Sequence, residues 1–131
     1  NPNYFIENQT SSYNPHIDLE PAESNKIIKK HISEGISIAK KNNLPDRVID
    51  FIRTHHGTTM IRFFYDKALK LNLSPNEFEF RYSGPRPFSK ETAIVMMADS
   101  IEAASKSLNK PNIKLIEDFV DKIIDKQMVF D

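Results

Sequence analysis

The chain has 131 residues, of which 18 are Lys or Arg and 18 are Asp or Glu, so its formal net charge is zero. This length suggests one domain with a modest core, and the balanced charge gives no reason to expect binding to a nucleic acid polymer or an anionic membrane surface. The absence of cysteine excludes disulfides and thiolate metal sites and fits a reducing compartment. No apolar run reaches the roughly 18–20 residues of a membrane span, so we expect the chain as given to be soluble.

The first half of the chain predicts an irregular start followed by helices. Residues 1–20 show neither a helical nor a strand period. Apolar residues then recur at helical spacing over 21–42, a stretch that opens with proline and ends in a lysine pair. Pro45 opens a second helix, for which Gly57 is a plausible end. Residues 58–72 continue the same apolar spacing and predict a third helix.

The second half predicts a loop and two further helices. Three prolines and a glycine within 73–90 indicate an ordered loop, in which the alternation FEFRY favours a brief extended segment. Ser89 is a good N-cap for a helix over 90–108, which is apolar on most faces and therefore expected to be central. Pro111 or Asn112 opens a last, amphipathic helix. Five helices and no convincing sheet predict an all-α domain.

Half of the four histidines stand side by side, as His55 and His56. The helix dipole explains one histidine at a helix C-terminus. Two neighbours point about 100° apart on a regular helix, so both can address one site only where the helix ends and the chain turns. Gly57 allows such a turn, and neutral imidazole is the commonest metal ligand. His31 lies on the apolar stripe of its own helix, where a lone histidine is more often a hydrogen-bonded core residue than a ligand.

Asp99 interrupts an apolar run that is expected to be buried. A buried carboxylate needs an arginine, a helix end or a metal as its partner, and this helix alone does not decide among them. Together, however, His31, His55, His56 and Asp99 come from three predicted helices, and each is expected to face an apolar interior. Helical bundles build metal sites from inward-facing histidines and carboxylates. Nitrogen and carboxylate ligands without sulfur suit Fe, Mn or Zn.

Four further residues are candidates for contact with a substrate. Arg81 and Arg86 flank a proline-rich loop that also carries Tyr82, and arginine is the residue best suited to clamp a phosphate. A solvated loop arginine is an equally good interpretation of both. His16, in the sequence NPH, is a substrate-binding group, a support for other site residues or simply a turn residue.

Several segments recur in a known family in the same order and spacing, and the most specific are HHGTT and ADSIEAA. The others are YFIENQ, NPH, LEPAES, IIKKHISEGISIAKK, RFFYDKA and FRYSGPRPFSKETAIVMM. With them the chain resembles, from Tyr4 to its last helix, the cytoplasmic HD domain of bacterial seven-transmembrane HD proteins. These are membrane-anchored phosphodiesterases that hydrolyse cyclic di-AMP. The resemblance implies that residues 1–131 are the C-terminal part of an HD phosphohydrolase domain, a partial all-α bundle with an irregular segment at 1–20 and helices over 21–131.

The resemblance also implies metal ligands. The family holds two divalent metals, expected to be Fe or Mn, through a histidine, a His-Asp pair, a further histidine, a His-His pair and an aspartate. The further histidine falls on His31, the His-His pair on His55 and His56, and the aspartate on Asp99. The three histidines would bind one metal and Asp99 the other, with no catalytic group beyond these ligands. In the family the His-Asp pair precedes the segment YFIENQ, where this chain has not yet begun. We therefore expect the chain alone to bind at most one metal and to be inactive.

The function implied is hydrolysis of cyclic di-AMP to the linear dinucleotide, at the cytoplasmic face of the bacterial inner membrane. The membrane would be reached only through segments outside this chain, and a homo-oligomer is compatible with it. Two alternatives stay open. One is an HD phosphohydrolase that acts on another nucleotide, and the other is a degenerate module that binds a ligand or signals without catalysis.

Overall fold

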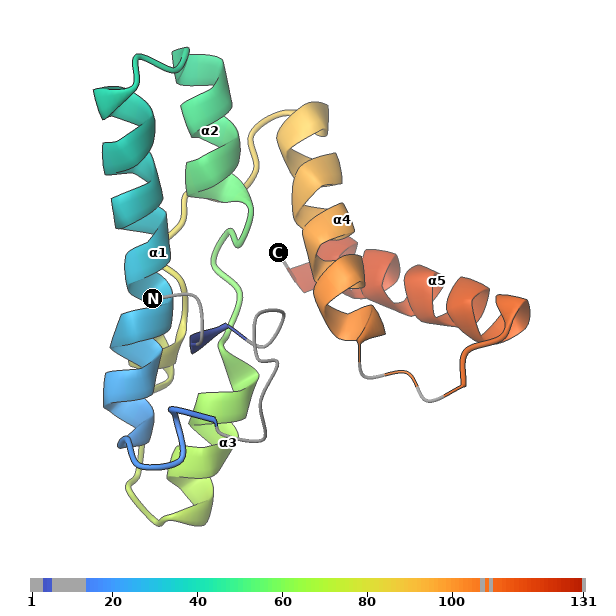
Figure 1. Cartoon of the computed structure of the whole chain (residues 1–131). Helices are drawn as coiled ribbons and strands as arrows, with labels where there is room; N and C mark the ends of the chain where they lie inside the picture. The colour runs from blue at the N-terminus through green and yellow to red at the C-terminus, as the bar shows by residue number, and fades with distance from the viewer. Residues whose placement is uncertain (1–3, 6–13, 107, 109, 131) are drawn as a thin grey trace. The chain divides into compact units, whose positions relative to one another are not determined.

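The computed structural model describes residues 4–5, 14–106, 108 and 110–130 (Figure 1). These residues contain a 3-10 helix and five α-helices, which confirms the predicted all-α class. Their only β-pairing is an isolated bridge between Met60 and Arg81. No helix among them is both long and apolar enough to cross a bilayer. The elements are α1 (Pro21–Lys41), α2 (Asp46–Thr54), α3 (Arg62–Lys70), η3 (Glu77–Phe80), α4 (Lys90–Ser105) and α5 (Ile113–Phe130).

The chain divides into two compact units, of which the first comprises residues 1–44 and 59–83. In this unit α1 packs along α3, and both helices contact η3. The side chain of Asn25 in α1 donates to the carbonyl oxygen of Glu79 in η3 at 2.6 Å, and Lys29 donates to the same oxygen at 2.9 Å. These bonds join α1 to η3 beside an apolar core. The core consists of Phe64, Ala68 and Phe80, with Ile28, Met60, Ile61 and Tyr65 packed around it.

The second unit comprises residues 45–58 and 84–131. Here α4 contacts both α2 and α5 (Figure 1). The start of α4 is fixed by a capping box, in which the Ser89 hydroxyl accepts from the Thr92 N–H at 3.2 Å while the Thr92 hydroxyl accepts from the Ser89 N–H at 3.1 Å. This capping box confirms the predicted cap at Ser89. Ile49 of α2 and Met96 of α4 are buried in this unit.

Most helix boundaries agree with the sequence pattern. The prediction 21–42 matches α1, and Pro45 is the N-cap of α2. Residues 14–20 form turns and bends, as expected for the irregular start, whereas positions 1–3 and 6–13 lie outside the described residues. The helix predicted over 90–108 is α4, which ends earlier at Ser105.

One local prediction is wrong and a second holds only in part. Residues 58–61 were expected to be helical and FEFRY to be extended. Instead the backbone at 59–61 pairs with residues 80–82, since Tyr82 N–H donates to Thr59 O at 2.9 Å and Ile61 N–H donates to Phe80 O at 2.7 Å. In FEFRY, Arg81 is extended and forms the bridge to Met60, as predicted. The preceding FEF instead belongs to η3, at whose start the side chain of Asn76 accepts from the backbone N–H of Phe78 at 3.1 Å.

The expected burial of α4 is also wrong. Only Thr92 and Met96 are buried along this helix, whereas Ile94 is 64% exposed and Val95 is 39% exposed. Within its unit α4 contacts α2 and α5, and these contacts leave Ile94 and Val95 exposed.

Candidate metal centre

The histidine pair lies where α2 ends. Thr54 is the last residue of α2, and His55 is its C-cap with φ −62° and ψ −16°. Gly57 then takes the left-handed conformation, with φ +51°, which only glycine adopts without strain. The rings of His55 and His56 lie with their centroids 4.1 Å apart and their planes 39° from each other. The end of the helix thus brings two successive imidazoles together, as the sequence predicted.

The helix backbone fixes which nitrogen carries the lone pair in two of the histidines. His55 Nδ1 lies 2.7 Å from the carbonyl oxygen of Ile52, three residues earlier. His31 Nδ1 makes the equivalent short contact with the carbonyl oxygen of Ile28 in α1. A carbonyl oxygen only accepts, so Nδ1 must carry the proton in both rings, and in the neutral tautomer the lone pair is on Nε2. Metal-binding histidines are typically oriented by such a bond from the other ring nitrogen.

Asp99 of α4 lies beside the pair, in the same unit. Its Oδ2 atom is 3.8 Å from Nδ1 of His56, beyond hydrogen-bond distance but within ion-pair range. The Asp99 side chain is 43% exposed, so the expectation of a buried carboxylate is wrong. The error has the same origin as the expected burial of α4, since both were inferred from the apolar composition of the helix. The Asp99 carboxylate nevertheless lies close to His56, which is a predicted metal ligand.

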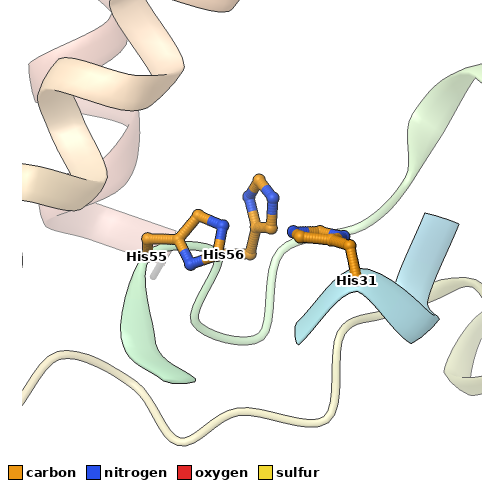
Figure 2. Close-up of side chains that lie close together, drawn as sticks. All are labelled: His31, His55 and His56. Atoms are coloured by element: carbon orange, nitrogen blue, oxygen red, sulfur yellow. The ribbon is translucent and has the colours of Figure 1, made fainter. Parts of the chain in front are cut away.

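His31, His55 and His56 form a group that could hold a metal ion. One ring nitrogen from each lies within 4.8 Å of those of the other two, and all three residues are half-buried. Figure 2 shows the three imidazoles close together. Three neutral nitrogen donors without sulfur suit a divalent transition metal. The donor set therefore fits the metal expected from the sequence, with Asp99 outside the group.

The candidate substrate residues have different surroundings. Arg86 is exposed, and its Nε donates to the hydroxyl of Thr58, two residues after the histidine pair, at 3.2 Å. Arg81 pairs with Glu77 at 2.9 Å. Tyr82 is buried at 8% exposure and lies edge-on to His31, with ring centroids 6.2 Å apart.

His16 is buried at 5% exposure, and its ring lies against Phe64 with centroids 4.8 Å apart. Its backbone N–H donates to the side chain of Asn14 at 2.9 Å, which is the turn geometry that the sequence NPH allowed.

Two neighbours of the histidines were not candidates from the sequence. Phe5 lies edge-on to His31 with ring centroids 5.3 Å apart. Thr58 connects the histidine pair to Arg86, as described above. The aromatic residues in an otherwise polar start were a visible signal for Phe5, because an irregular segment without a packing role seldom keeps them. Nothing in the sequence distinguished Thr58 from its neighbour Thr59.

Comparison with known proteins gives concordant results. The model of the HD domain family matches residues 10–104. The chain is 44% identical over 123 residues to the cyclic-di-AMP phosphodiesterase PgpH of Listeria monocytogenes serotype 1/2a (strain 10403S), covering 94% of this chain and 17% of that protein. It is 43% identical over 127 residues to PgpH of Bacillus subtilis (strain 168), covering 97% of this chain and 18% of that protein. The chain thus spans less than a fifth of the length of these curated relatives.

A solved structure gives a similar match. The crystal structure of the L. monocytogenes phosphodiesterase PgpH HD domain in complex with cyclic-di-AMP superposes with a TM-score of 0.91 at 42% sequence identity. The match covers 98% of this chain and 60% of that one. A second structure of the same HD domain superposes with a TM-score of 0.89 at 41% identity.

Proposed function

Because the chain belongs to the HD domain family, we propose that it is part of a metal-dependent phosphodiesterase that opens cyclic di-AMP to the linear dinucleotide. The observation that carries the proposal is the group of His31, His55 and His56 in a chain 43–44% identical to two cyclic-di-AMP phosphodiesterases. The complex of a similar HD domain with cyclic-di-AMP supports the choice of substrate.

In this proposal His31, His55 and His56 hold one divalent metal, and Asp99 serves a second. Fe or Mn is the metal pair that the family resemblance implies. Divalent metals lower the pKa of a bound water and neutralise phosphate charge in hydrolases of this kind. The role of the protein is to orient the side chains that bind the metals. His31 and His55 are held by their own helices, and Asp99 lies 3.8 Å from His56, where its negative charge favours a cation beside that ring.

Arg86 is the best placed of the candidate substrate residues. Its Nε bond to Thr58 fixes one side of the guanidinium, and the exposed Nη groups are available for a phosphate oxygen. Arg81 is committed to Glu77, so we propose only a long-range electrostatic role for it. Tyr82 packs edge-on against His31, which favours a role as a wall of the site over stacking on a base. For His16 the burial of its ring argues against direct contact with a substrate.

The family resemblance further supports a place at the cytoplasmic face of the bacterial inner membrane and leaves self-association open. The expectation that these 131 residues alone bind at most one metal and lack activity stays a prediction. It is checked by comparing hydrolysis of cyclic di-AMP by this chain and by a longer form that includes the upstream family motif, both with Mn²⁺. Full activity of the 131-residue chain would contradict it.

The metal role has its own test. Mn²⁺ binding is measured by calorimetry for the unaltered chain and for His55→Ala, which we expect to bind at least about tenfold more weakly. Asp99→Asn is compared with Asp125→Asn, an exposed aspartate of α5. We expect only the change at Asp99 to weaken binding. Unchanged Mn²⁺ affinity in His55→Ala would refute the site.

The alternative of a non-catalytic module gives a different outcome in the longer form. Such a module would bind cyclic di-AMP without turning it over at saturating Mn²⁺. A phosphohydrolase with another substrate would be identified by faster hydrolysis of a competing cyclic dinucleotide or of a mononucleotide under the same conditions.

A further inference from the structure

A short aromatic segment, Tyr4–Phe5, lies between two histidines of the first unit. The carbonyl oxygen of Tyr4 is 2.8 Å from Nε2 of His16, and the Tyr4 ring lies edge-on to the His16 ring with centroids 5.1 Å apart. The next residue, Phe5, lies edge-on to His31 with centroids 5.3 Å apart. One end of this dipeptide is therefore held by a buried histidine, and the other end lies on a proposed metal ligand.

His16 is itself firmly fixed. Its ring packs on Phe64 of the apolar core, and its backbone N–H bonds to Asn14. The ammonium group of Lys67 donates to the carbonyl oxygens of His16 and Leu19 at 3.0 and 3.2 Å. These contacts tie the turn that carries His16 to α3, so His16 is a rigid point from which another segment can be positioned.

The protonation of His16 indicates what this side chain contributes. Since the Tyr4 carbonyl only accepts, Nε2 of His16 is the donor, and Nδ1 carries the lone pair in the neutral ring. That Nδ1 atom is buried and has no hydrogen-bond partner among the described residues. A buried acceptor without a partner is unfavourable, because it has lost its hydrogen bond to water. A phenylalanine would fill the same space without this cost, so the distinctive contribution of histidine is its bond to Tyr4.

The ring of His31 has an aromatic neighbour on each of two segments. Tyr82 is anchored by its own N–H bond to Thr59 and is buried. Phe5 is held through Tyr4 and His16. Edge-on aromatic contacts restrict the orientation of a ring, and together with the Nδ1 bond to Ile28 they leave His31 few alternative rotamers.

We propose that Tyr4–Phe5 is an aromatic strap, anchored by His16, that orients the proposed metal ligand His31. The inference rests on the proposed metal role of His31 and gives His16 a positioning role instead of a substrate contact. Residues that orient a ligand typically change metal affinity by about 10–100-fold when they are replaced. His16 should therefore influence the metal although it contacts only the strap, the core and the turn.

The first test needs no metal. The ring signals of His31 are recorded in long-range ¹H–¹⁵N spectra of the metal-free chain, for the unaltered protein, His16→Phe and Phe5→Ala. We expect both variants to move these signals in the same direction, because both remove the Phe5 ring from His31. His16→Gln, which keeps a donor that can reach Tyr4, should restore them. Phe78→Ala is the matched control, since Phe78 is 80% exposed and lies in η3 of the same unit.

The second test uses Mn²⁺ calorimetry on the same variants. His16→Phe and Phe5→Ala should each weaken Mn²⁺ binding about tenfold, and the double variant should be no weaker than either, because both changes release one strap. Additive effects on Mn²⁺ affinity, or His31 signals that do not move in His16→Phe, would overturn the inference.

His31→Ala distinguishes failure of the strap from failure of the proposed metal role. Loss of Mn²⁺ in His31→Ala with unchanged binding in Phe5→Ala would leave the metal site standing and remove the strap. Should the unaltered chain bind no Mn²⁺, the metal role and the inference would both fail.

Discussion

Gly57 is the position at which a single substitution should disturb the geometry of the histidine pair most. It follows His56 directly and has φ +51°. A Cβ atom at this position would lie 3.3 Å from both Cε and Sδ of Met96 and 3.5 Å from Cδ of Pro87. Gly57→Ala thus introduces a strained backbone conformation and a close contact with a buried side chain of α4.

The two effects can be given magnitudes. The left-handed conformation costs an L-residue about 1–2 kcal/mol. Met96 is buried, but the atoms that the new methyl group meets are the flexible thioether end, so we expect crowding to add less than about 1 kcal/mol. The sum is roughly 2 kcal/mol of lost unfolding free energy. For a chain of this size that loss lowers the Tm by roughly 6–10 °C.

The assay is thermal and urea unfolding followed by circular dichroism, with Gly35→Ala as the matched control. Gly35 lies inside α1, where alanine is favoured over glycine by about 1 kcal/mol, so the same chemical change should raise stability there. Equal stability of Gly57→Ala and the unaltered chain would refute the argument, because the left-handed turn after the histidines would then not be needed. A gain of stability at both positions would refute it as well.

Four further predictions concern single interactions. Ser89→Ala removes the cap of α4 and should cost about 1 kcal/mol in urea unfolding, whereas a loss under about 0.3 kcal/mol would contradict the cap. The pKa of Glu91 is lowered from its ordinary 4.5 by its own backbone N–H and by Ser89, so its contribution to stability is complete above pH 4.5 and is lost as the pH falls through the lowered value. The difference in unfolding free energy between the unaltered chain and Glu91→Gln should therefore vanish as the pH falls from 4.5 through the lowered pKa. A difference that does not depend on pH would show that ionisation of Glu91 does not stabilise the fold. Asn25→Ala removes the bond from a buried side chain to the carbonyl oxygen of Glu79 and should cost about 1–2 kcal/mol. Lys29→Met should cost less, because burial outweighs the attraction of Glu79 and lowers the pKa of Lys29.

The helices that could be predicted from sequence are those with local signals at their ends. The proline that opens α1, the proline before α2 and the Ser89 cap of α4 all act on residues within one turn. Such signals do not depend on what the helix packs against. The boundaries they gave agree with the structure to within a few residues.

The errors occurred where the backbone bonds to a distant segment. Residues 59–61 have helical spacing, but their N–H and C=O groups bond to residues 80–82, about twenty positions later. Apolar spacing cannot show such a pairing. The burial of α4 failed for a related reason, since the composition of a helix states how apolar its faces are and does not say how many of them have a neighbour. Asp99 was predicted to be buried by the same reasoning. Its side chain is 43% exposed, so composition alone does not predict burial here.

The geometry of the proposed metal group depends partly on contacts within one helical turn and partly on contacts between distant segments of the chain. His31 and His55 each bond through Nδ1 to the carbonyl oxygen three residues earlier, so one helical turn leaves Nε2 as the nitrogen with the lone pair for the proposed metal. The approach of His56 to His55 is also local, because it requires only the helix end and the turn at Gly57. That His31 joins them depends on segments more than twenty residues apart in the chain. A peptide covering α2 and Gly57 should therefore bind Mn²⁺ far more weakly than the whole chain, because it supplies two of the three nitrogens and none of the orientation of the third.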